Sequence, residues 1–170
     1  KFHLMGIMEH IETAGIHSGD SNAFLPFFNL TPLELQDIVD YAKKIALELK
    51  VKGLINIQFA IKDGKVYVIE ANPRASRTTP FIAKAYNKPY LNYATKVMLG
   101  EIKVEDIPEE KLLDGLAIKE PVFSFNKFPG VSKELGPEMK STGEAIRFIK
   151  ILRDPYFREL YKDMSMYLSK

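Results

Sequence analysis

Two oxygen-bearing side chains stand two positions apart near the end of an apolar run. They are Glu70 and Asn72, and Pro73 follows them directly. In a β-strand, residues i and i+2 point to the same face, so both side chains would lie together. Mg²⁺ takes oxygen ligands and commonly completes its shell with phosphate oxygens, so the pattern is compatible with a hard-cation site. The plain alternative is a pair of strand-end polar residues that face water.

Two arginines, Arg74 and Arg77, come shortly after this pair. Guanidinium groups beside metal-type ligands suit a phosphate-transfer site, because cations neutralise the charge that develops on the transferred group. Ordinary ion pairs with Glu70, or a solvated surface, would explain the same arginines. The arginines nevertheless favour a phosphate-transfer site over a plain pair of strand-end polar residues.

A third oxygen-bearing side chain, Gln58, lies in the preceding apolar run. Residues 54–61 and 65–71 are rich in Ile, Val, Phe and Tyr, and a Gly-containing turn separates them. This pattern predicts a β-hairpin. Gln58 can join the site only if it shares a face of the hairpin with Glu70.

The turn of this hairpin decides that question. With a two-residue turn at 63–64, Gln58 points away from Glu70. With a three-residue turn at 62–64, Gln58 pairs with Val68 and lies on the same face as Glu70, diagonally related. A shared site therefore predicts the three-residue turn.

The segment after the first apolar run is a polar loop over 15–22. His17 and Ser18 could contact a nucleotide there, and Gly15 would allow close approach of the backbone. His17 has no second ligand at metal spacing, and Ser18 lacks the context of a hydrolase nucleophile. The sequence contains neither a P-loop nor a G-x-G-x-x-G motif, so any ATP would bind by other means.

The remaining elements follow from apolar periodicity and from Gly and Pro. Thr31 to Glu34 combines an N-cap, a proline and a capping box, which predicts a helix to about Leu49. Antiparallel strands interleaved with helices predict an α+β fold rather than a doubly wound parallel sheet. Further helices are expected over 78–86, over 90–99 and from Gly143, and further strands over 7–14 and 116–125.

The composition excludes several classes of function. A chain of 170 residues with 46% hydrophobic and 27% charged residues can form a packed globular domain. Its 24 basic and 22 acidic residues give a net charge of +2, too small for a nucleic-acid or membrane surface. No apolar run reaches the roughly 18 residues of a membrane-spanning helix. The absence of cysteine excludes disulfides and is compatible with the cytoplasm.

Several longer strings carry a resemblance to a known family. They are M-E-H-I-E at 8–12, G-I-H-S-G-D-S at 15–21, N-I-Q-F-A at 56–60, V-I-E-A-N-P-R-A-S-R at 68–77, F-N-K-F-P-G at 125–130 and L-G-P-E-M-K-S-T-G-E at 135–144. Together they resemble the large chains of carbamoyl-phosphate synthase, which contain two homologous synthetase units of the ATP-grasp superfamily. The first and last strings are similar to the second unit, which phosphorylates carbamate.

The resemblance implies an ATP-dependent carbon–nitrogen ligase with an ATP-grasp fold, an antiparallel sheet flanked by helices. It implies Gln58, Glu70 and Asn72 as ligands of Mg²⁺ or Mn²⁺, with K⁺ as a further candidate cation. It also implies Arg74 as a catalytic residue beside the transferred phosphoryl group. The implied nucleotide contacts are Gly15, Ile16, His17, Ser18, Gln58 and Glu70.

The same resemblance implies a domain division and a set of partners. Residues 1–144 would form the ATP-grasp core lobe, and 145–170, beyond the match, a helical C-terminal extension. The implied partners are ATP, carbamate or bicarbonate, the remaining part of the large subunit and a glutaminase small subunit, serving pyrimidine and arginine synthesis in the cytoplasm. The family's pre-ATP region and lid lobe are missing, so the chain is expected to be a fragment with little or no ATP turnover alone.

Two alternatives stay open from the sequence. Another ATP-grasp ligase, biotin-carboxylase-like or from the purine pathway, would release ADP with a different substrate, although P-E-M-K-S-T-G-E argues against it. A non-catalytic interaction domain would fail to bind Mg-ATP even with the missing N-terminal region supplied. The presence of Gln58, Glu70, Asn72 and Arg74 argues against such a decayed site.

Overall fold

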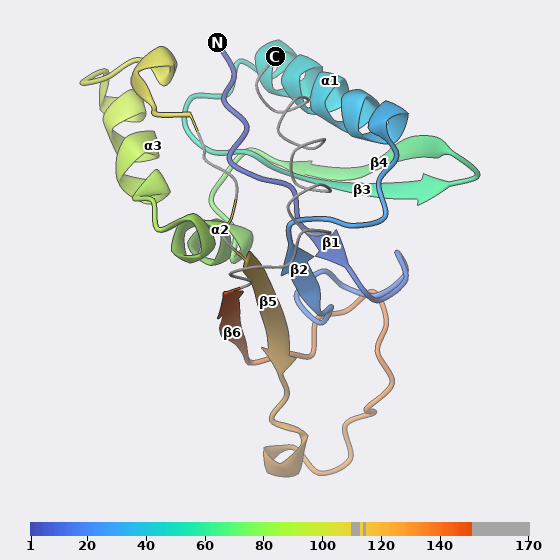
Figure 1. The fold of residues 1–170 in the computed structure, drawn as a ribbon. Coiled ribbons are helices and arrows are strands. Elements are labelled where there is room, and N and C mark those ends of the chain that lie inside the picture. The colour runs from blue at the N-terminus through green and yellow to red at the C-terminus, as the bar shows by residue number, and fades with distance from the viewer. Residues whose placement is uncertain (110–112, 114, 151–170) are drawn as a thin grey trace. The chain divides into compact units, whose positions relative to one another are not determined.

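The computed structural model describes residues 1–109, 113 and 115–150. The chain divides into two compact units (Figure 1). The described part of the first, the helix–hairpin unit, consists of residues 1–6 and 29–109. The described part of the second, the sheet unit, consists of residues 7–28, 113 and 115–150.

Helix α1 of the helix–hairpin unit spans Pro32–Glu48, which confirms the helix predicted from the capping signal. The Thr31 side chain accepts a hydrogen bond from the Glu34 backbone N–H at 3.3 Å, and the Glu34 carboxylate accepts one from the Thr31 N–H at 2.8 Å. These bonds satisfy donors at the helix start that have no intrahelical partner. Bonds from Thr31 also hold the pKa of Glu34 below its ordinary value. The apolar residues that α1 buries are Leu35, Ile38 and Ala42.

The predicted hairpin is present as β3 (Asn56–Lys62) and β4 (Lys65–Asn72), which lie beside α1 in Figure 1. The strand ends pair directly across a two-residue turn, so the three-residue turn predicted from the shared-site argument is wrong. The physical reason lies in the turn residues. Asp63 (φ 53°) and Gly64 (φ 69°) both adopt the left-handed region, as a type I′ turn requires.

A β-bulge nevertheless places Gln58 on the face of Glu70. Near the turn the ladder is regular, and Phe59 pairs with Val68. The register then shifts by one residue, so that Gln58 pairs with Glu70 and Ile69 is the extra residue on β4. A bulge inserts one residue into one strand and re-aims the side chains that follow. The shared face was predicted correctly, but for the wrong structural reason.

The turn geometry predicts the effect of one substitution. Gly64→Ala should lower the free energy of unfolding by about 1 kcal/mol, because a Cβ disfavours the left-handed backbone that Gly64 adopts. Gly136→Ala is the matched control, since Gly136 has open space around its Cα and no positive φ. Denaturant unfolding of both variants makes the comparison. Equal stability of the two variants would contradict the assigned turn.

Helices α2 (Thr78–Tyr86) and α3 (Tyr90–Leu99) have the bounds predicted from the sequence. Each ends at a residue in the left-handed conformation, Asn87 after α2 and Gly100 after α3. This is the usual way to terminate a helix, and asparagine and glycine tolerate it best. A short 3₁₀ helix, η1, follows at Val104–Asp106. The buried core residues of α2 and α3 are Phe81, Ile82, Tyr90 and Ala94.

The sheet unit is built on a four-stranded antiparallel sheet with the strand order β1-β2-β5-β6. Its core is small, with Ala23, Leu25 and Ala117 fully buried. A 3₁₀ helix, η2 (Phe125–Lys127), follows β5. The strands are β1 (Glu9–His10), β2 (Ala23–Leu25), β5 (Gly115–Val122) and β6 (Gly143–Lys150).

Three predictions for this unit need correction. The strand expected over 7–14 is confined to β1, and β2 was not predicted because it is only three residues long. The strand expected over 116–125 ends at Val122. The helix expected from Gly143 is wrong, since β6 begins there and pairs with β5 along its whole length.

The error at β6 has a physical explanation. Ile146 and Phe148 favour strands, and pairing with β5 overrides the local pattern that predicts a helix. The helical extension predicted for 145–170 is therefore wrong over 145–150. Residues 151–170 lie outside the described part of the chain, so the domain division at 144 stays a prediction.

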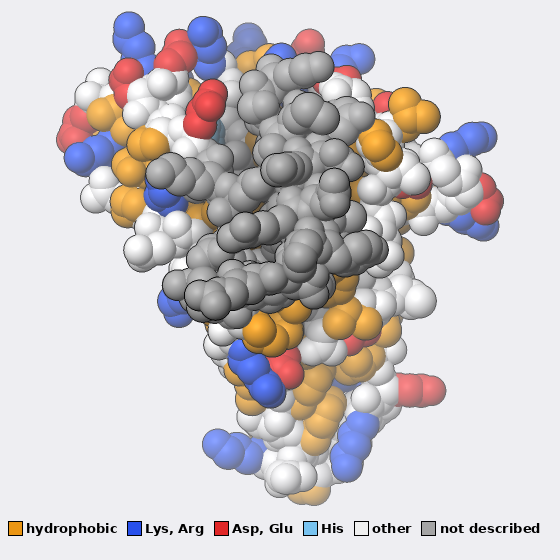
Figure 2. Space-filling model, in the orientation of Figure 1, with side chains coloured by type: hydrophobic (Ala, Val, Ile, Leu, Met, Phe, Trp, Pro, Cys, Tyr) orange, Lys and Arg blue, Asp and Glu red, His pale blue; other side chains and the backbone are white. Residues whose placement is uncertain are grey.

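The structure confirms the α+β class, with antiparallel strands and separate helices. Within the described residues, no helix has the length and apolarity needed to cross a bilayer. On the face seen in Figure 2, basic and acidic side chains are interspersed over the surface rather than gathered into one patch. This agrees with the nearly balanced charge of the sequence.

Candidate functional site

Four of the predicted site residues meet at the end of the β3–β4 hairpin, and we call Gln58, Glu70, Asn72 and Arg74 the hairpin site. Gln58 lies opposite Glu70, and Asn56 lies opposite Asn72. The Asn72 Nδ2 group donates to Glu70 Oε1 at 2.9 Å. An Arg74 Nη group donates to Asn72 Oδ1 at 3.4 Å. A carboxylate, an amide and a guanidinium are thus linked in a row.

The local sequence explains why Arg74 points back toward the strand end. Pro73 cannot extend the ladder of β4, which ends at Asn72. The Arg74 backbone N–H donates to the Asn72 carbonyl at 2.8 Å, which closes a tight turn. Glu70 and Arg74 are exposed, whereas Gln58 and Asn72 are partly buried. The polar ends of the hairpin site can therefore reach a ligand from solvent.

The donor set of the hairpin site fits a hard cation that shares a ligand. Gln58, Glu70 and Asn72 offer amide and carboxylate oxygens, which suit Mg²⁺ or Mn²⁺. Over the described ranges, no group of three or more His, Cys, Asp or Glu residues could hold a metal ion. A cation at the hairpin site therefore cannot rely on a cage of protein carboxylates. Its further oxygens would come from water or from a bound molecule such as a phosphate ester.

Sequence reasoning gave no role to Asn56, which the structure places across from Asn72. The signal was available, because Asn56 and Gln58 are two positions apart on one strand and share a face. Asn56 is partly buried and adds a further amide beside the hairpin site. Arg77, the other arginine of the sequence pattern, occupies the N-cap position of α2, next to the hairpin site in sequence.

The other predicted residues, 15–18, lie in the loop between β1 and β2 of the sheet unit. The His17 backbone N–H donates to the Gly136 carbonyl at 2.8 Å. The His17 ring accepts a hydrogen bond at Nδ1 from the Gly19 N–H at 3.0 Å. A neutral His17 ring therefore carries its proton on Nε2. The two groups of predicted residues belong to different compact units.

A buried carboxylate that sequence reasoning missed fastens this loop. Asp20 is 0% exposed. Its carboxylate accepts hydrogen bonds from the backbone N–H groups of Lys140 and Ser141, both at 2.8 Å. Burial alone would raise the pKa of Asp20, but the bonds from Ser141 and Lys140, with a smaller effect of His17, hold that pKa below its ordinary value. Asp20 is therefore ionised at neutral pH.

A buried lysine fastens the same loop from β5. Lys119 is 3% exposed, and its ammonium donates to the Ser18 carbonyl at 3.0 Å. Ser21, which is also fully buried, donates from its hydroxyl to the His17 carbonyl at 3.3 Å. Main-chain groups of the loop are thus held by one side chain from β5 and by one from the loop itself. No sequence signal links Lys119 to the loop, because the contact joins residues 101 positions apart.

Comparison with known protein families identifies the family of the chain. The sequence model of the family "Carbamoyl-phosphate synthase L chain, ATP binding domain" matches residues 4–105. That range contains both the hairpin site and the loop over 15–18. The chain belongs to this family.

Curated relatives confirm the assignment at high identity. The large chain of carbamoyl phosphate synthase from Archaeoglobus fulgidus is 58% identical over 142 residues, which are 83% of this chain and 13% of the relative. The C-terminal section of the large chain from Methanocaldococcus jannaschii is 47% identical over 163 residues, which are 89% of this chain and 26% of the relative. This family member thus spans only a small part of the length of the curated relatives it matches.

Solved structures show the ATP-grasp fold. The biotin carboxylase domain of a single-chain bacterial carboxylase is similar with a TM-score of 0.56 and 19% identity, covering 88% of this chain and 40% of that one. An ADP complex of N5-carboxyaminoimidazole ribonucleotide synthetase is similar with a TM-score of 0.56 and 20% identity, covering 96% and 44%. At these identities the likeness concerns the fold alone.

A second polar group of the sheet unit closes the loop between β1 and β2 at its base. The Glu12 carboxylate accepts bonds from the Asn22 backbone N–H and from its side-chain amide, both at 2.6 Å. Beside it, burial lowers the pKa of His10 to about 4, and the nearby Lys119 charge acts in the same direction, while Glu12 opposes both. His10 is therefore neutral in the folded state at neutral pH.

This neutral histidine predicts a loss of stability in mild acid. Between the ordinary pKa of 6.5 and the folded value of about 4, the unfolded chain binds a proton at His10 that the folded chain does not. The contribution is fully present above pH 6.5 and falls by roughly 3 kcal/mol as the pH decreases to 4. Denaturant unfolding between pH 7 and pH 4 should show a smaller decline for His10→Gln. An unchanged decline would contradict the assignment.

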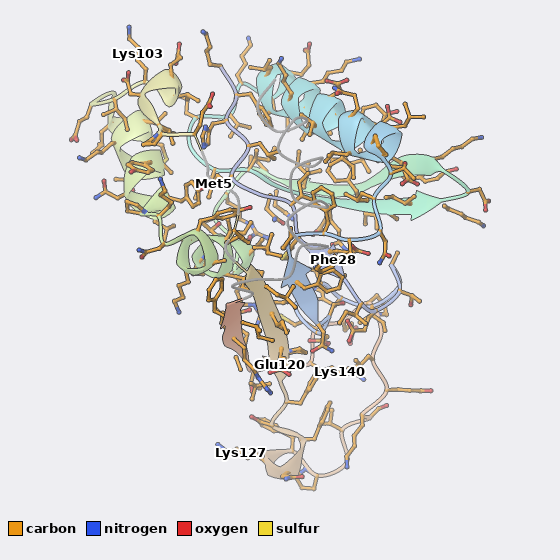
Figure 3. All side chains as sticks on the ribbon, in the orientation of Figure 1. Met5, Phe28, Lys103, Glu120, Lys127 and Lys140 are labelled. Atoms are coloured by element: carbon orange, nitrogen blue, oxygen red, sulfur yellow. The ribbon has the colours of Figure 1, made fainter. Side chains whose placement is uncertain are left out.

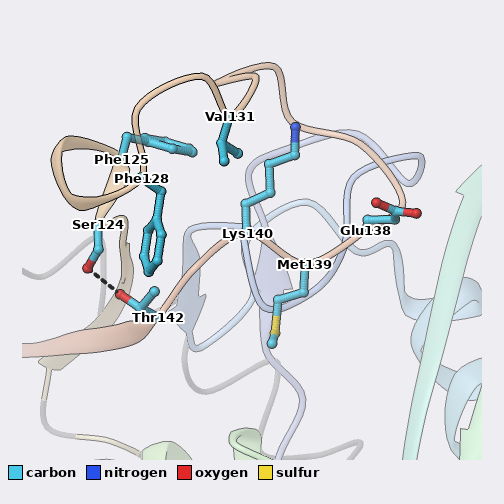
Figure 4. Close-up of a pocket in the computed structure, with 8 residues that line it drawn as sticks. All are labelled: Ser124, Phe125, Phe128, Val131, Glu138, Met139, Lys140 and Thr142. Carbon is cyan, nitrogen blue, oxygen red and sulfur yellow. Dashed lines mark hydrogen bonds between the residues drawn. The ribbon is translucent and has the colours of Figure 1, made fainter.

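A surface pocket of about 260 Å³ also lies in the sheet unit (Figure 4). The Ser124 and Thr142 hydroxyls are hydrogen-bonded at 2.8 Å on one side of it. None of the predicted site residues lines it. The lining residues are Ser124, Phe125, Phe128, Val131, Glu138, Met139, Lys140 and Thr142.

Proposed function

We propose that this chain is the part of a carbamoyl-phosphate synthase large chain that binds Mg-ATP and phosphorylates carbamate. The observation that carries the proposal is the pairing of Gln58 with Glu70 beside Asn72 and Arg74. This geometry places oxygen ligands for a metal ion beside the positively charged guanidinium of Arg74, as phosphoryl transfer requires. The match to a C-terminal section supports the second synthetase unit over the first.

The hairpin site would divide the work among its residues. Gln58, Glu70 and Asn72 would hold Mg²⁺ or Mn²⁺, which supplies charge neutralisation at the phosphates of ATP. Arg74 would lie beside the transferred phosphoryl group and stabilise the negative charge that spreads over its oxygens. Asn72, which is hydrogen-bonded to both Glu70 and Arg74, would hold these two charged groups in fixed positions relative to each other.

The nucleotide itself would extend along Gly15, Ile16, His17 and Ser18. These residues lie in a loop whose main chain is already held by Lys119 and Asp20. A loop fixed before binding loses little conformational entropy when the nucleotide arrives. Gln58 and Glu70 of the hairpin site would act on the phosphates of ATP by holding the cation.

The proposed reaction needs no covalent enzyme intermediate. A carbamate oxygen attacks the γ-phosphorus of ATP, and the bond between that phosphorus and the β–γ bridging oxygen breaks. The products are ADP and carbamoyl phosphate, so atoms and charge balance without a further reactant. The enzyme residues act by position and charge rather than as nucleophiles.

The remaining assignments follow from the family and are part of the proposal. The chain would work with the rest of the large subunit, with K⁺ as a further cation, and with a glutaminase subunit that supplies nitrogen. Its setting would be pyrimidine and arginine synthesis in the cytoplasm. Because it spans 13% of the A. fulgidus large chain, we expect little or no turnover from the 170 residues alone.

Substrate-dependent release of ADP tests the proposed reaction. The chain is supplied with the remaining part of a large chain, and ADP release is measured with bicarbonate and ammonia, which form carbamate. We expect carbamoyl phosphate to form with at least one ADP released for each molecule, and ATP to form when ADP and carbamoyl phosphate are supplied instead. Mg-ATP binding with no release of ADP under either condition would overturn the proposed reaction.

A further inference from the structure

The proposed reaction gives no chemical step to Asp20, a charged residue that is completely buried in the sheet unit. Asp20 is fully buried, yet it belongs to the same loop as the residues that would contact the nucleotide. A buried carboxylate is costly unless hydrogen bonds satisfy it. Its partners are backbone N–H groups of Lys140 and Ser141 rather than a lysine or arginine side chain.

These partners come from a distant part of the sequence. About 120 residues separate Asp20 from Lys140, which lies in the loop before β6 (Figure 3). The Ser141 hydroxyl donates to the Gly19 carbonyl at 2.8 Å, and Gly136 accepts from the His17 N–H at 2.8 Å. The segment 136–141 is therefore bonded to the loop on both sides of Ser18.

The geometry requires a carboxylate at this position. Each oxygen of Asp20 accepts one N–H group, Oδ2 from Lys140 and Oδ1 from Ser141. An asparagine has one oxygen and one NH₂ group, so it could accept only one of the two donors. The other backbone N–H would be left buried without a partner and would face an amide donor. Asp20→Asn therefore changes the contact with almost no change in shape.

The bonds connect Asp20 to the predicted nucleotide contacts. Asp20 is bonded through its own N–H to the His17 carbonyl at 2.9 Å, and Gly19 beside it bonds the His17 ring. On the other side, Lys119 holds the Ser18 carbonyl. Release of segment 136–141 would remove the partner of the His17 N–H, because that group donates to the Gly136 carbonyl.

We infer that Asp20 is a positioning residue for the nucleotide, acting through segment 136–141 on His17 and Ser18. The inference rests on the proposed function, because it assigns Asp20 a part in holding the same nucleotide. Asp20 itself touches neither nucleotide nor metal in this scheme. It makes L-G-P-E-M-K-S, which is far away in the sequence, a structural part of the nucleotide site.

The test compares Asp20→Asn with wild type in the large chain that the proposed function requires. We expect the KM for ATP to rise at least 10-fold, while the KM for bicarbonate and kcat at saturating ATP change less than 2-fold. Amide hydrogen exchange at Lys140 and Ser141 should accelerate in the same variant. Asp37→Asn on the exposed side of α1 is the matched control and should leave every value unchanged.

Two further variants keep the test decisive. If Asp20→Asn does not fold, Ser141→Ala replaces it. This variant removes the hydroxyl that bonds Gly19 and helps to lower the pKa of Asp20, and it keeps both backbone N–H bonds to Asp20. We expect about a 3-fold rise in the KM for ATP. Glu70→Ala tests the proposed function separately. Loss of ATP binding in Glu70→Ala, with wild-type KM values in Asp20→Asn or its substitute, would overturn this inference alone. Failure of the wild-type chain to bind ATP would overturn both.

Discussion

Replacement of Glu70 by alanine should weaken Mg²⁺-dependent ATP binding at least 100-fold. Glu70 is the one carboxylate of the hairpin site, opposite Gln58 and bonded to Asn72. The other two proposed ligands are neutral amides, which bind a divalent cation less strongly than a carboxylate does. Without Glu70, the cation would be held by neutral oxygens and by the nucleotide alone. Calorimetric titration with Mg-ATP, with the remaining part of a large chain present, measures the effect.

The control for this experiment is Glu101→Ala, which removes an exposed carboxylate of the same unit. It should bind Mg-ATP as wild type does. A titration with ATP in the presence of a chelator separates the metal-dependent part of the affinity. ATP binding that is indifferent to Glu70, or to the metal, would exclude the assigned ligand set and leave only the fold.

Replacement of Arg74 by alanine should act on the rate rather than on binding. We expect kcat for ADP release to fall about 100- to 1,000-fold, the usual size for loss of one group that stabilises transition-state charge. The KM for ATP should stay within about 3-fold, because the ground-state nucleotide keeps its other contacts. Arg74→Lys should recover only part of the rate, since an ammonium cannot reproduce the planar donor set of a guanidinium. Steady-state kinetics at saturating substrate measure these values.

Arg147→Ala serves as the control for charge. Arg147 pairs with Glu120 across the exposed surface of β5 and β6, with Nε and Oε2 2.9 Å apart. Its removal should cost little, because exposed ion pairs contribute about 1 kcal/mol or less to stability. A parallel fall of kcat in both variants would show a nonspecific effect of charge. An Arg74→Ala variant with a higher KM and normal kcat would move Arg74 from catalysis to binding.

The elements that were predicted well are those with strong local signals. The capping box at Thr31 fixed the start of α1, and Pro89 and Gly100 marked the limits of α3. These signals act within one turn of helix, so a single sequence contains them. The short strands β1 and β2 and the late strand β6 depend on partners far along the chain, and local patterns could not reveal them.

The candidate site shows the same division. Glu70, Asn72 and Arg74 could be grouped from the sequence because they are close together on one strand and the turn that follows. Asp20 could not be connected to Ser141, because the contact closes a loop of about 120 residues and depends on tertiary structure. The resemblance included both strings without indicating that they touch. Only the structure shows that the string containing Ser141 is hydrogen-bonded to the string containing Asp20.

The bulge at Ile69 has a consequence for how this hairpin can vary. An odd number of residues lies between Gln58 and Glu70, so a regular ladder with an even-numbered turn would send their side chains to opposite faces. One odd-numbered irregularity must therefore lie between them, either a bulge or a three-residue turn. Both solutions place the two side chains on one face, directly opposite each other with the bulge and diagonally related with the three-residue turn. The site therefore requires that the number of residues between Gln58 and Glu70 stay odd while one such irregularity is present, whatever the type of turn. Insertions or deletions in this segment should be tolerated in pairs.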